Sequence, residues 1–420
     1  DGLKTVYVWI ADAANNVNDN AVTDTITLDT TVPATPTVAL SDQNTSSTTN
    51  TNLALVNLSI TGDADATRWC VIEQDAGSAN PTAPTFSSGC FVTPKPTTVT
   101  LGAEGSRKVF VYTRDVALNV SAAAAIATIN YSTAALADPT LALTDATTSS
   151  ATHVRQVGTA VSIGNDASAT KWCVSETQTT KPANGTAACN GGAWVGTRPT
   201  TFNVSGGDGL KTIYVWVADV SNNVNANAVT DTITLDTALP ANPTVALSDT
   251  NTSSTTDTNL STVTLAITSD TDAVAWCSIE QANATAAPAA PTYNSCSTTW
   301  LGTRPTTQAL GATGLRKIYV YTRDVAGNIS AAAATATINY STSAPDDPTL
   351  ALTDGTTSSA THVRQVATAL SIGNDGTATK WCVSESQTTK PANGTAACNG
   401  GAWVGTRPTT FNVSGGDGLK

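Results

Sequence analysis

The sequence predicts an all-β protein, in which tandem β-sandwich modules of about seven strands each follow one another in an elongated array. Three observations support this prediction: a composition typical of strands and turns, a long internal repeat, and turn residues at short intervals. Thr, Val, Ile and aromatic residues favour strands, whereas Gly, Pro, Asn and Asp favour turns. No stretch of the sequence has the pattern of a long helix.

One long unit occurs twice in the sequence. Residues 1–42 match residues 208–249 at 34 of 42 positions, and residues 147–211 match residues 356–420 at 60 of 65 positions. Trp-Cys dipeptides recur at steps of 103 to 105 residues, which divides each unit into two divergent modules. We therefore expect a strand pair of an incomplete module at 1–31, module A at 33–132, module B at 135–237, module A′ at 240–341, and module B′, lacking its last strands, at 345–420.

The strands of module A are predicted from alternating apolar residues and the turns between them. They are expected at 37–40, 53–60, 67–74, 97–101, 107–114 and 124–131, with a Ser/Thr/Asn-rich connection at 43–52. Short strands with turn signals at intervals of roughly 8–12 residues are typical of an immunoglobulin-like sandwich. We expect this fold in every module.

The sequence KTVYVWIAD at residues 4–12 represents the sixth strand of a module. Val6, Val8 and Ile10 point to one face and Tyr7 and Trp9 to the other, so this strand belongs in the middle of a sheet. We assign the β-branched row to the core. The aromatic row is expected to contact a neighbouring module or cross-strand partners, or else to cap the sheet surface. Equivalent strands occur at 108–115, 211–219 and 317–324.

A tight hairpin turn with the pattern D-x-x-x-N follows each sixth strand. Its ends are Asp12 and Asn16, Asp115 and Asn119, Asp219 and Asn223, and Asp324 and Asn328. The fourth residue is Asn15, Leu118, Asn222 or Gly327. Asn and Gly tolerate a positive φ, whereas Leu does not, so we predict a different turn at Leu118.

The segment KIYVYTRDVAGN at residues 317–328 resembles the end of the bacterial immunoglobulin-like repeats of large surface adhesins and cell-wall proteins. The resemblance extends to every module. It implies the fold, a location outside the cell or on the bacterial cell surface, and a spacer role that holds a terminal binding domain away from the cell. A Cys pair in every module departs from the common pattern of those repeats.

The eight cysteines fall into four local pairs separated by 16 to 20 residues. They are Cys70 and Cys90, Cys173 and Cys189, Cys277 and Cys296, and Cys382 and Cys398. Without flanking His residues or CxxC clusters the spacing disfavours zinc. It favours disulfides and an oxidising exterior, with buried free thiols as the alternative. A Trp precedes the first Cys of each pair, and we expect it to fill the core while the Cys reaches the neighbouring loop: Trp69, Trp172, Trp276 and Trp381.

Calcium is the one cofactor that the acidic residues suggest. The pairs Asp63 and Asp65, and Asp270 and Asp272, have the D-x-D pattern of oxygen ligands, although acids in turns also hydrogen-bond their own backbone. We therefore expect no cofactor, with calcium as the alternative.

Other acidic and basic side chains do not indicate an enzyme. A single Glu follows each Trp-Cys, whereas glycoside hydrolysis needs two carboxylates: Glu73, Glu176, Glu280 and Glu385. The two His residues, His153 and His362, lie near no nucleophile motif. The net charge of −12 disfavours a nucleic-acid partner, and no apolar run reaches the roughly 18 residues of a membrane span.

The expected function is that of a structural spacer within a giant extracellular bacterial repeat protein that forms a rod, fibre or filament. The alternative is an adhesin that binds glycan or protein through the Cys-closed loops or the aromatic strand faces. Residues 1–29 repeat the strands that residues 345–420 lack, and Met is absent. We expect neighbouring copies as partners, either because the sequence continues in a longer periodic chain, which we favour, or by head-to-tail donation of this strand pair.

Overall fold

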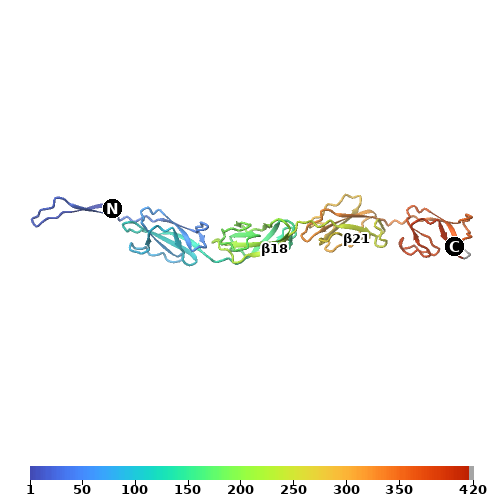
Figure 1. Cartoon of the computed structure of the whole chain (residues 1–420), viewed down its shortest axis with the longest axis horizontal. Helices are drawn as coiled ribbons and strands as arrows, with labels where there is room; N and C mark the ends of the chain where they lie inside the picture. The colour runs from blue at the N-terminus through green and yellow to red at the C-terminus, as the bar shows by residue number, and fades with distance from the viewer. Residues whose placement is uncertain (416–420) are drawn as a thin grey trace. The chain divides into compact units, whose positions relative to one another are not determined.

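The computed structural model describes residues 1–415, and within them every regular element is a β-strand (Figure 1). This confirms the all-β prediction. The strands form because β-branched and aromatic residues alternate with polar ones, and turn residues interrupt the alternation after a few positions. The chain divides into two compact units, Asp1–Thr237 and Ala238–Lys420.

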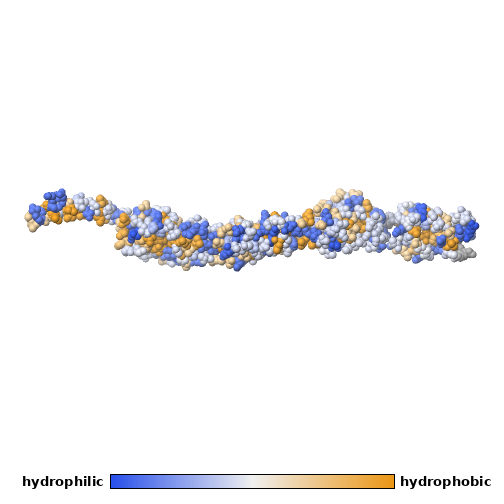
Figure 2. Space-filling model, viewed as in Figure 1, coloured by the Kyte–Doolittle hydropathy of each residue, from blue (hydrophilic) through white to orange (hydrophobic). Residues whose placement is uncertain are grey.

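The first unit begins with a hairpin. Strands β1 (Gly2–Val8) and β2 (Val22–Leu28) form a two-stranded antiparallel sheet. Its apolar side chains are exposed, Trp9 at 54% and Ile26 at 69%. Orange apolar residues accordingly run along this hairpin in Figure 2.

Residues 37–131 form two packed sheets, which we call sandwich A. One sheet has the strand order β3-β5-β8 and the other has the order β4-β10-β9-β6-β7. The core between them contains Leu40 and Val56 from the first sheet and Val109 and Ile129 from the second. Two mainly antiparallel sheets with this order are an immunoglobulin-like sandwich. The strands are β3 (Thr37–Ser41), β4 (Asn50–Thr51), β5 (Leu55–Thr61), β6 (Arg68–Asp75), β7 (Phe91–Val92), β8 (Thr98–Thr100), β9 (Gly105–Arg114) and β10 (Ala125–Tyr131).

Residues 140–235 repeat this arrangement as sandwich B. Its sheets have the orders β11-β13-β16 and β12-β18-β17-β14-β15. Leu143, Val161, Ile213 and Ile233 lie in the core between them. The strands are β11 (Thr140–Asp145), β12 (His153–Val154), β13 (Gly158–Gly164), β14 (Lys171–Ser175), β15 (Trp194–Val195), β16 (Thr201–Asn203), β17 (Gly209–Ala218) and β18 (Val229–Leu235).

The second unit contains sandwich A′ at residues 244–340. Its sheets have the orders β19-β21-β23 and β20-β25-β24-β22, and Leu265 and Ile318 lie in the core between them. The strands are β19 (Thr244–Ser248), β20 (Asp257–Thr258), β21 (Thr262–Thr268), β22 (Ala275–Ala282), β23 (Thr307–Ala309), β24 (Gly314–Arg323) and β25 (Ala334–Tyr340).

Residues 349–412 of the same unit form the open sandwich B′. It consists of a three-stranded sheet of order β26-β27-β30 and a two-stranded sheet, β28-β29. Val363, the equivalent of the fully buried Val154 in sandwich B, is 38% exposed. The strands are β26 (Thr349–Asp354), β27 (Ala367–Gly373), β28 (Trp381–Cys382), β29 (Trp403–Val404) and β30 (Thr410–Asn412).

The six strands expected in module A are all present, and no end is shifted by more than two residues. Strands β4 and β7 were not expected from the sequence. Strand β4 lies inside the Ser/Thr/Asn-rich connection and β7 lies in the Cys loop. Strands of two residues show no alternation, so only their pairing partners reveal them.

Candidate functional site

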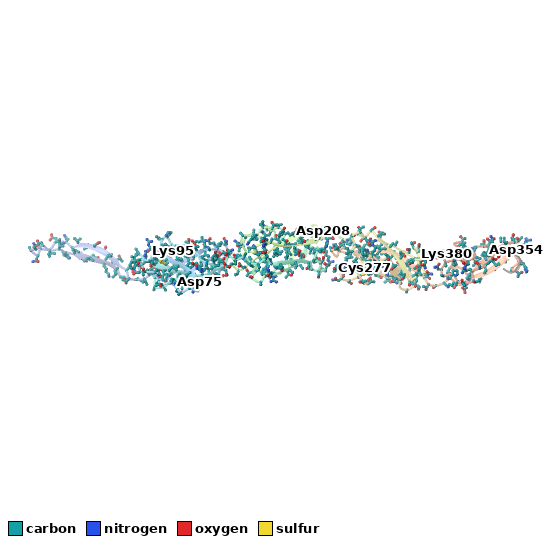
Figure 3. The ribbon with its side chains drawn as sticks, turned by 90° about the horizontal axis from the view of Figure 1, so that it is seen from below. Asp75, Lys95, Asp208, Cys277, Asp354 and Lys380 are labelled. Atoms are coloured by element: carbon teal, nitrogen blue, oxygen red, sulfur yellow. A yellow bond between two sulfur atoms is a disulfide. The ribbon has the colours of Figure 1, made fainter. Side chains whose placement is uncertain are left out.

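The eight cysteines form four disulfides, each between the strand that carries the Trp-Cys dipeptide and the loop that follows it. The bonds join the four pairs expected from the sequence: Cys70–Cys90, Cys173–Cys189, Cys277–Cys296 and Cys382–Cys398. Figure 3 marks Cys277 in sandwich A′. Each bond closes a loop of its own sandwich, so covalent cross-linking is local to each sandwich.

The Trp and Cys of the dipeptide lie in different clusters in sandwiches A, B and A′. Trp172 belongs to the main core of sandwich B, whereas Cys173 is fully buried on the opposite face of the same sheet. Trp276 and Cys277 are separated in the same way. Successive side chains of a strand point to opposite faces, so one dipeptide contributes to two clusters. Of the other two, Trp69 packs against the core of sandwich A and Trp381 is half-buried in β28.

The aromatic face of the long sixth strand packs against the disulfide of its own sandwich. In β17, Trp216 is 3% exposed and lies in one cluster with Cys173 and Cys189. Its Nε1 donates a hydrogen bond to the carbonyl oxygen of Gln178 in the Cys loop at 2.9 Å. The sequence left open what meets this face, and the structure places the closed loop there. The equivalent clusters are Phe110 and Tyr112 with Cys70, and Tyr319 and Tyr321 with Cys277.

A buried Asp connects each signature Trp to a cation, an arrangement that we call the Asp–Trp–cation group. Asp166 accepts a hydrogen bond from Trp172 Nε1 at 2.7 Å and lies 2.7 Å from a guanidinium nitrogen of Arg198. The buried carboxylate is stabilised because it is both hydrogen-bonded and paired. The other groups are Asp63–Trp69–Lys95, Asp270–Trp276–Arg304 and Asp375–Trp381–Arg407.

The Asp–Trp–cation group was not expected from the sequence, although the sequence contains a signal for it. In all four modules the Asp precedes its Trp by six residues. The regular spacing places a loop carboxylate beside the indole of the following strand. The cation is harder to find from sequence, because it is Lys in one sandwich and Arg in the others.

In each D-x-D pair considered for calcium, the first Asp belongs to an Asp–Trp–cation group. Asp63 and Asp270 bind a Trp and a cation, and Asp272 accepts from the backbone N–H of Ala241 at 3.3 Å. Within residues 1–415, no three His, Cys, Asp or Glu side chains gather in a group that could hold a metal ion. Asp63, Asp270 and Asp272 therefore have partners within the protein.

The Glu and His residues considered for catalysis take part in contacts of the fold. Glu73 forms an ion pair with the largely buried Arg107, and the hydrogen bond from this guanidinium to Glu73 raises the pKa of Arg107. Glu176 accepts from the backbone N–H of Ser205 at 2.7 Å. His153 lies in β12, which pairs with β18. The equivalent Glu contacts are Glu280–Arg316 and Glu385–Ser414.

The D-x-x-x-N turns have one geometry in all four copies, so the prediction of a different turn at Leu118 was wrong. Leu118 has a φ of 73°, close to the 69° of Asn15 and the 68° of Asn222. The reason is the Asp carboxylate: Asp115 accepts from the backbone N–H of Asn119 at 2.8 Å and from its Nδ2 at 2.9 Å. These bonds fix the turn and hold Leu118 in the left-handed region.

In the hairpin at the start of the chain, Asp12 accepts the same bonds from Asn16. The hydrogen bond from the Asn16 side chain, together with those from backbone N–H groups, lowers the pKa of Asp12. The turn therefore keeps its structure even where no second sheet covers the strands.

Residues 1–415 contain no helix long and apolar enough to cross a membrane.

No known protein family and no curated protein sequence matches this chain. It is similar to parts of solved structures at low scores. The adhesin FdeC of Escherichia coli is 16% identical, with a TM-score of 0.33 over 73% of this chain and 97% of that one. A 1.5-MDa bacterial ice-binding adhesin is 16% identical, with a TM-score of 0.26 over 74% and 100%. Fibronectin(III)-like modules of Clostridium thermocellum CbhA are 12% identical, with a TM-score of 0.29 over 47% and 93%.

Proposed function

We propose that this chain is a structural spacer, a segment of a large extracellular bacterial repeat protein in which immunoglobulin-like sandwiches provide reach and stiffness without enzymatic activity. One observation carries the proposal. The recurring side chains all form contacts within the fold: the disulfide and the Asp–Trp–cation group of the four sandwiches, and the D-x-x-x-N turn of the hairpin and of sandwiches A, B and A′. A repeated binding or catalytic site would instead direct recurring polar groups towards a ligand.

The disulfides support an extracellular location. All eight cysteines are bonded, and stable disulfides persist in oxidising surroundings. Closing a loop of this size stabilises a sandwich by about 3 kcal/mol in the chain-entropy model. That is a large part of the stability of a small domain.

Strand directions support a role under tension. In sandwiches A, B and A′, a short strand near the beginning runs parallel to the last strand: β4 with β10, β12 with β18, and β20 with β25. Pulling on the two ends of such a sandwich loads these hydrogen bonds along the strand direction. The hydrogen bonds of this two-residue pairing must then break together, whereas a hairpin that is pulled apart from one end loses its bonds singly.

Neighbouring copies are the partners that we propose for the hairpin and for the open sandwich. Residues 1–29 repeat residues 208–236, which supply β17 and β18 to sandwich B. Trp216 is 3% exposed and its counterpart Trp9 is 54% exposed, while Val363 is open where Val154 is buried. The missing surfaces are supplied by adjoining repeats of the same chain or by a second copy, head to tail.

Analytical ultracentrifugation of two chains distinguishes a partner in the same chain from a partner in a second copy. One is the 420-residue chain, and the other is the same chain with a copy of residues 5–31 added after Lys420, which completes sandwich B′ in the same molecule. Concentration-dependent association of the first chain that disappears in the second supports head-to-tail donation. Monomers in both cases support completion by the same chain.

A single-molecule pulling experiment on the full chain tests the spacer function. We expect one separate unfolding event for each closed sandwich. A chain that lengthens without such events contradicts the proposal.

A second candidate function is ligand binding through the Cys loops. The observation in its favour is Phe86, which lies in the Cys loop of sandwich A and is 58% exposed. Against it, Tyr293 at the equivalent position stacks on Arg323, and the loops of the two B modules are nearly identical. A glycan array and a cell-binding assay on the full chain decide between the two functions. Saturable binding that Phe86→Ala removes supports the adhesin and contradicts a pure spacer.

A further inference from the structure

The peptide group between Ser132 and Thr133 connects sandwich A to sandwich B, and sandwich A holds its N–H side. The backbone N–H of Thr133 donates a hydrogen bond to Glu104 Oε1 at 3.1 Å, and the Thr133 hydroxyl donates to the same oxygen. Glu104 directly precedes β9. The start of the connection is therefore attached to the sandwich that it leaves.

Sandwich B holds the other side of the same peptide group. The carbonyl oxygen of Ser132 accepts a hydrogen bond from Asn223 Nδ2 at 2.9 Å. Asn223 closes the D-x-x-x-N turn between β17 and β18, and Asp219 orients its amide through a bond of 3.1 Å. One planar peptide group is thus bound by a carboxylate from the preceding sandwich and by an amide from the following one.

The same arrangement occurs between the hairpin and sandwich A. The backbone N–H of Thr30 donates to Asp1 Oδ1 at 3.1 Å, and the carbonyl oxygen of Asp29 accepts from Asn119 Nδ2 at 3.0 Å. The acid is Asp here and Glu in the next connection, yet the bonded atoms of the peptide are the same. After sandwich B, Thr237 N–H again donates to an acid, Asp208, at 2.9 Å (Figure 3 labels Asp208).

The end of the connection between sandwiches A and B is also fixed. Asp138 accepts from the backbone N–H of Asn227 at 2.9 Å and from its Nδ2 at 2.8 Å. These bonds, the side-chain one foremost, lower the pKa of Asp138. A direct contact adds to them, because Asn52 Nδ2 of sandwich A lies 3.4 Å from the carbonyl oxygen of Asn222. The connection is held at both ends and does not behave as a free linker.

We propose that this doubly bound peptide group is an orientation lock, which fixes the angle between sandwiches A and B and limits bending at the connection. The inference deepens the proposed spacer function and rests on it for its biological meaning. Since φ and ψ on either side of a planar peptide are the only soft torsions, binding both of its polar atoms restricts the rotations that would reorient one sandwich against the other. Two residues make the lock. One is the acid before the sixth strand of the first sandwich, and the other is the Asn that ends the D-x-x-x-N turn of the next sandwich.

The test uses Glu104→Ala in the full chain, because Glu104 lies outside both cores and its hydrogen bonds go to Thr133. Two readouts are compared with the unchanged chain. One is the distance distribution between labels on the exposed Ser78 and Thr179, introduced as non-natural amino acids so that the disulfides stay intact. The other is the hydrogen-exchange rate of the Thr133 amide.

We expect Glu104→Ala to widen the distance distribution and to speed exchange at Thr133 by about tenfold. Glu104→Gln, whose side-chain oxygen still accepts, restores both in part. The control is Asp65→Ala, which removes an exposed acid of sandwich A away from the connection and leaves both readouts unchanged. Asn223→Ala removes the hydrogen bond to the Ser132 carbonyl oxygen and is also expected to widen the distance distribution.

An equally wide distribution in the unchanged chain and in Glu104→Ala overturns the lock. That result leaves a flexible spacer possible. Ligand binding in the assays above would overturn the spacer function while leaving the lock in place, so the two failures are distinguishable.

Discussion

The indole Nε1 of Trp172 donates a hydrogen bond of 2.7 Å to the carboxylate of Asp166, six residues earlier in the chain. Trp172 fills the main core of sandwich B, and Asp166 lies in the turn that precedes its strand. The bond gives the one polar atom of a core side chain a partner and attaches the turn to the core. Because the group recurs in four modules, it is a feature of the repeat and not of one loop.

Replacing Asp166 by Ala is expected to destabilise sandwich B by roughly 2–4 kcal/mol, since it leaves a buried indole N–H without an acceptor. Hydrogen exchange of the β14 amides measures the loss within that sandwich. The comparison variant is Arg198→Ala, which removes the half-exposed cation but leaves the hydrogen bond from Trp172 to Asp166 in place, so a smaller loss is expected. Equal losses in the two variants would contradict the importance of the buried bond.

Leu118→Gly is expected to stabilise sandwich A by about 1 kcal/mol. Leu118 has a φ of 73°, a conformation that costs a residue with a Cβ about 1–2 kcal/mol, and its side chain is 46% exposed. Chemical denaturation measures the gain. Leu118→Asn, which copies Asn15 and Asn222, should give part of it, whereas Val116→Ala in the same turn should change nothing. A loss of stability in both Leu118 variants would show that the side chain contributes more by packing than the backbone strain costs.

The double variant Cys173→Ser with Cys189→Ser is expected to lower the stability of sandwich B by about 3 kcal/mol. It should also loosen Trp216, whose partner on the outer face is this disulfide. Exchange of sandwich B amides should accelerate while those of sandwich A stay as they were. Simultaneous unfolding of both sandwiches in a thermal melt would show that their cores are not independent.

Acid is expected to weaken sandwich A′ through Asp249. Burial raises the pKa of this Asp, but hydrogen bonds from Thr258 and Thr252 outweigh it, and the pKa is lowered from 3.8. A lowered pKa stabilises the fold above the unfolded-state pKa of about 3.9, and this contribution is lost as the pH falls through the lower folded-state value.

Denaturation midpoints measured between pH 7 and pH 2 should therefore lose the Asp249 contribution only below about pH 3.9. Asp249→Asn should be less stable than the unchanged chain at pH 7, with a smaller difference at the acid end of the series. A difference that does not change with pH would contradict the role of the carboxylate charge.

The strands and the repeat could be predicted from sequence because their signals are local. Val6, Val8 and Ile10 alternate with aromatics, and the Trp-Cys dipeptide that begins each Cys pair recurs every 103 to 105 residues. What the sequence did not reveal depends on pairing across the fold. The packing of Trp216 against a disulfide depends on the path of the Cys loop, which the sequence does not show. Leu118 adopts a positive φ because the hydrogen bonds of Asp115 impose that turn, although Leu itself disfavours this conformation.

The four closed loops also limit how far the protein can lengthen. Cys173 and Cys189 are separated by 16 residues, and the corresponding separations in the other pairs reach 20. At about 3.3–3.6 Å per extended residue, each bond withholds on the order of 50–70 Å of contour length when its sandwich unravels. An oxidised chain under strong load thus stops extending earlier than a reduced one, which makes the redox state of the surroundings a control on its maximum length.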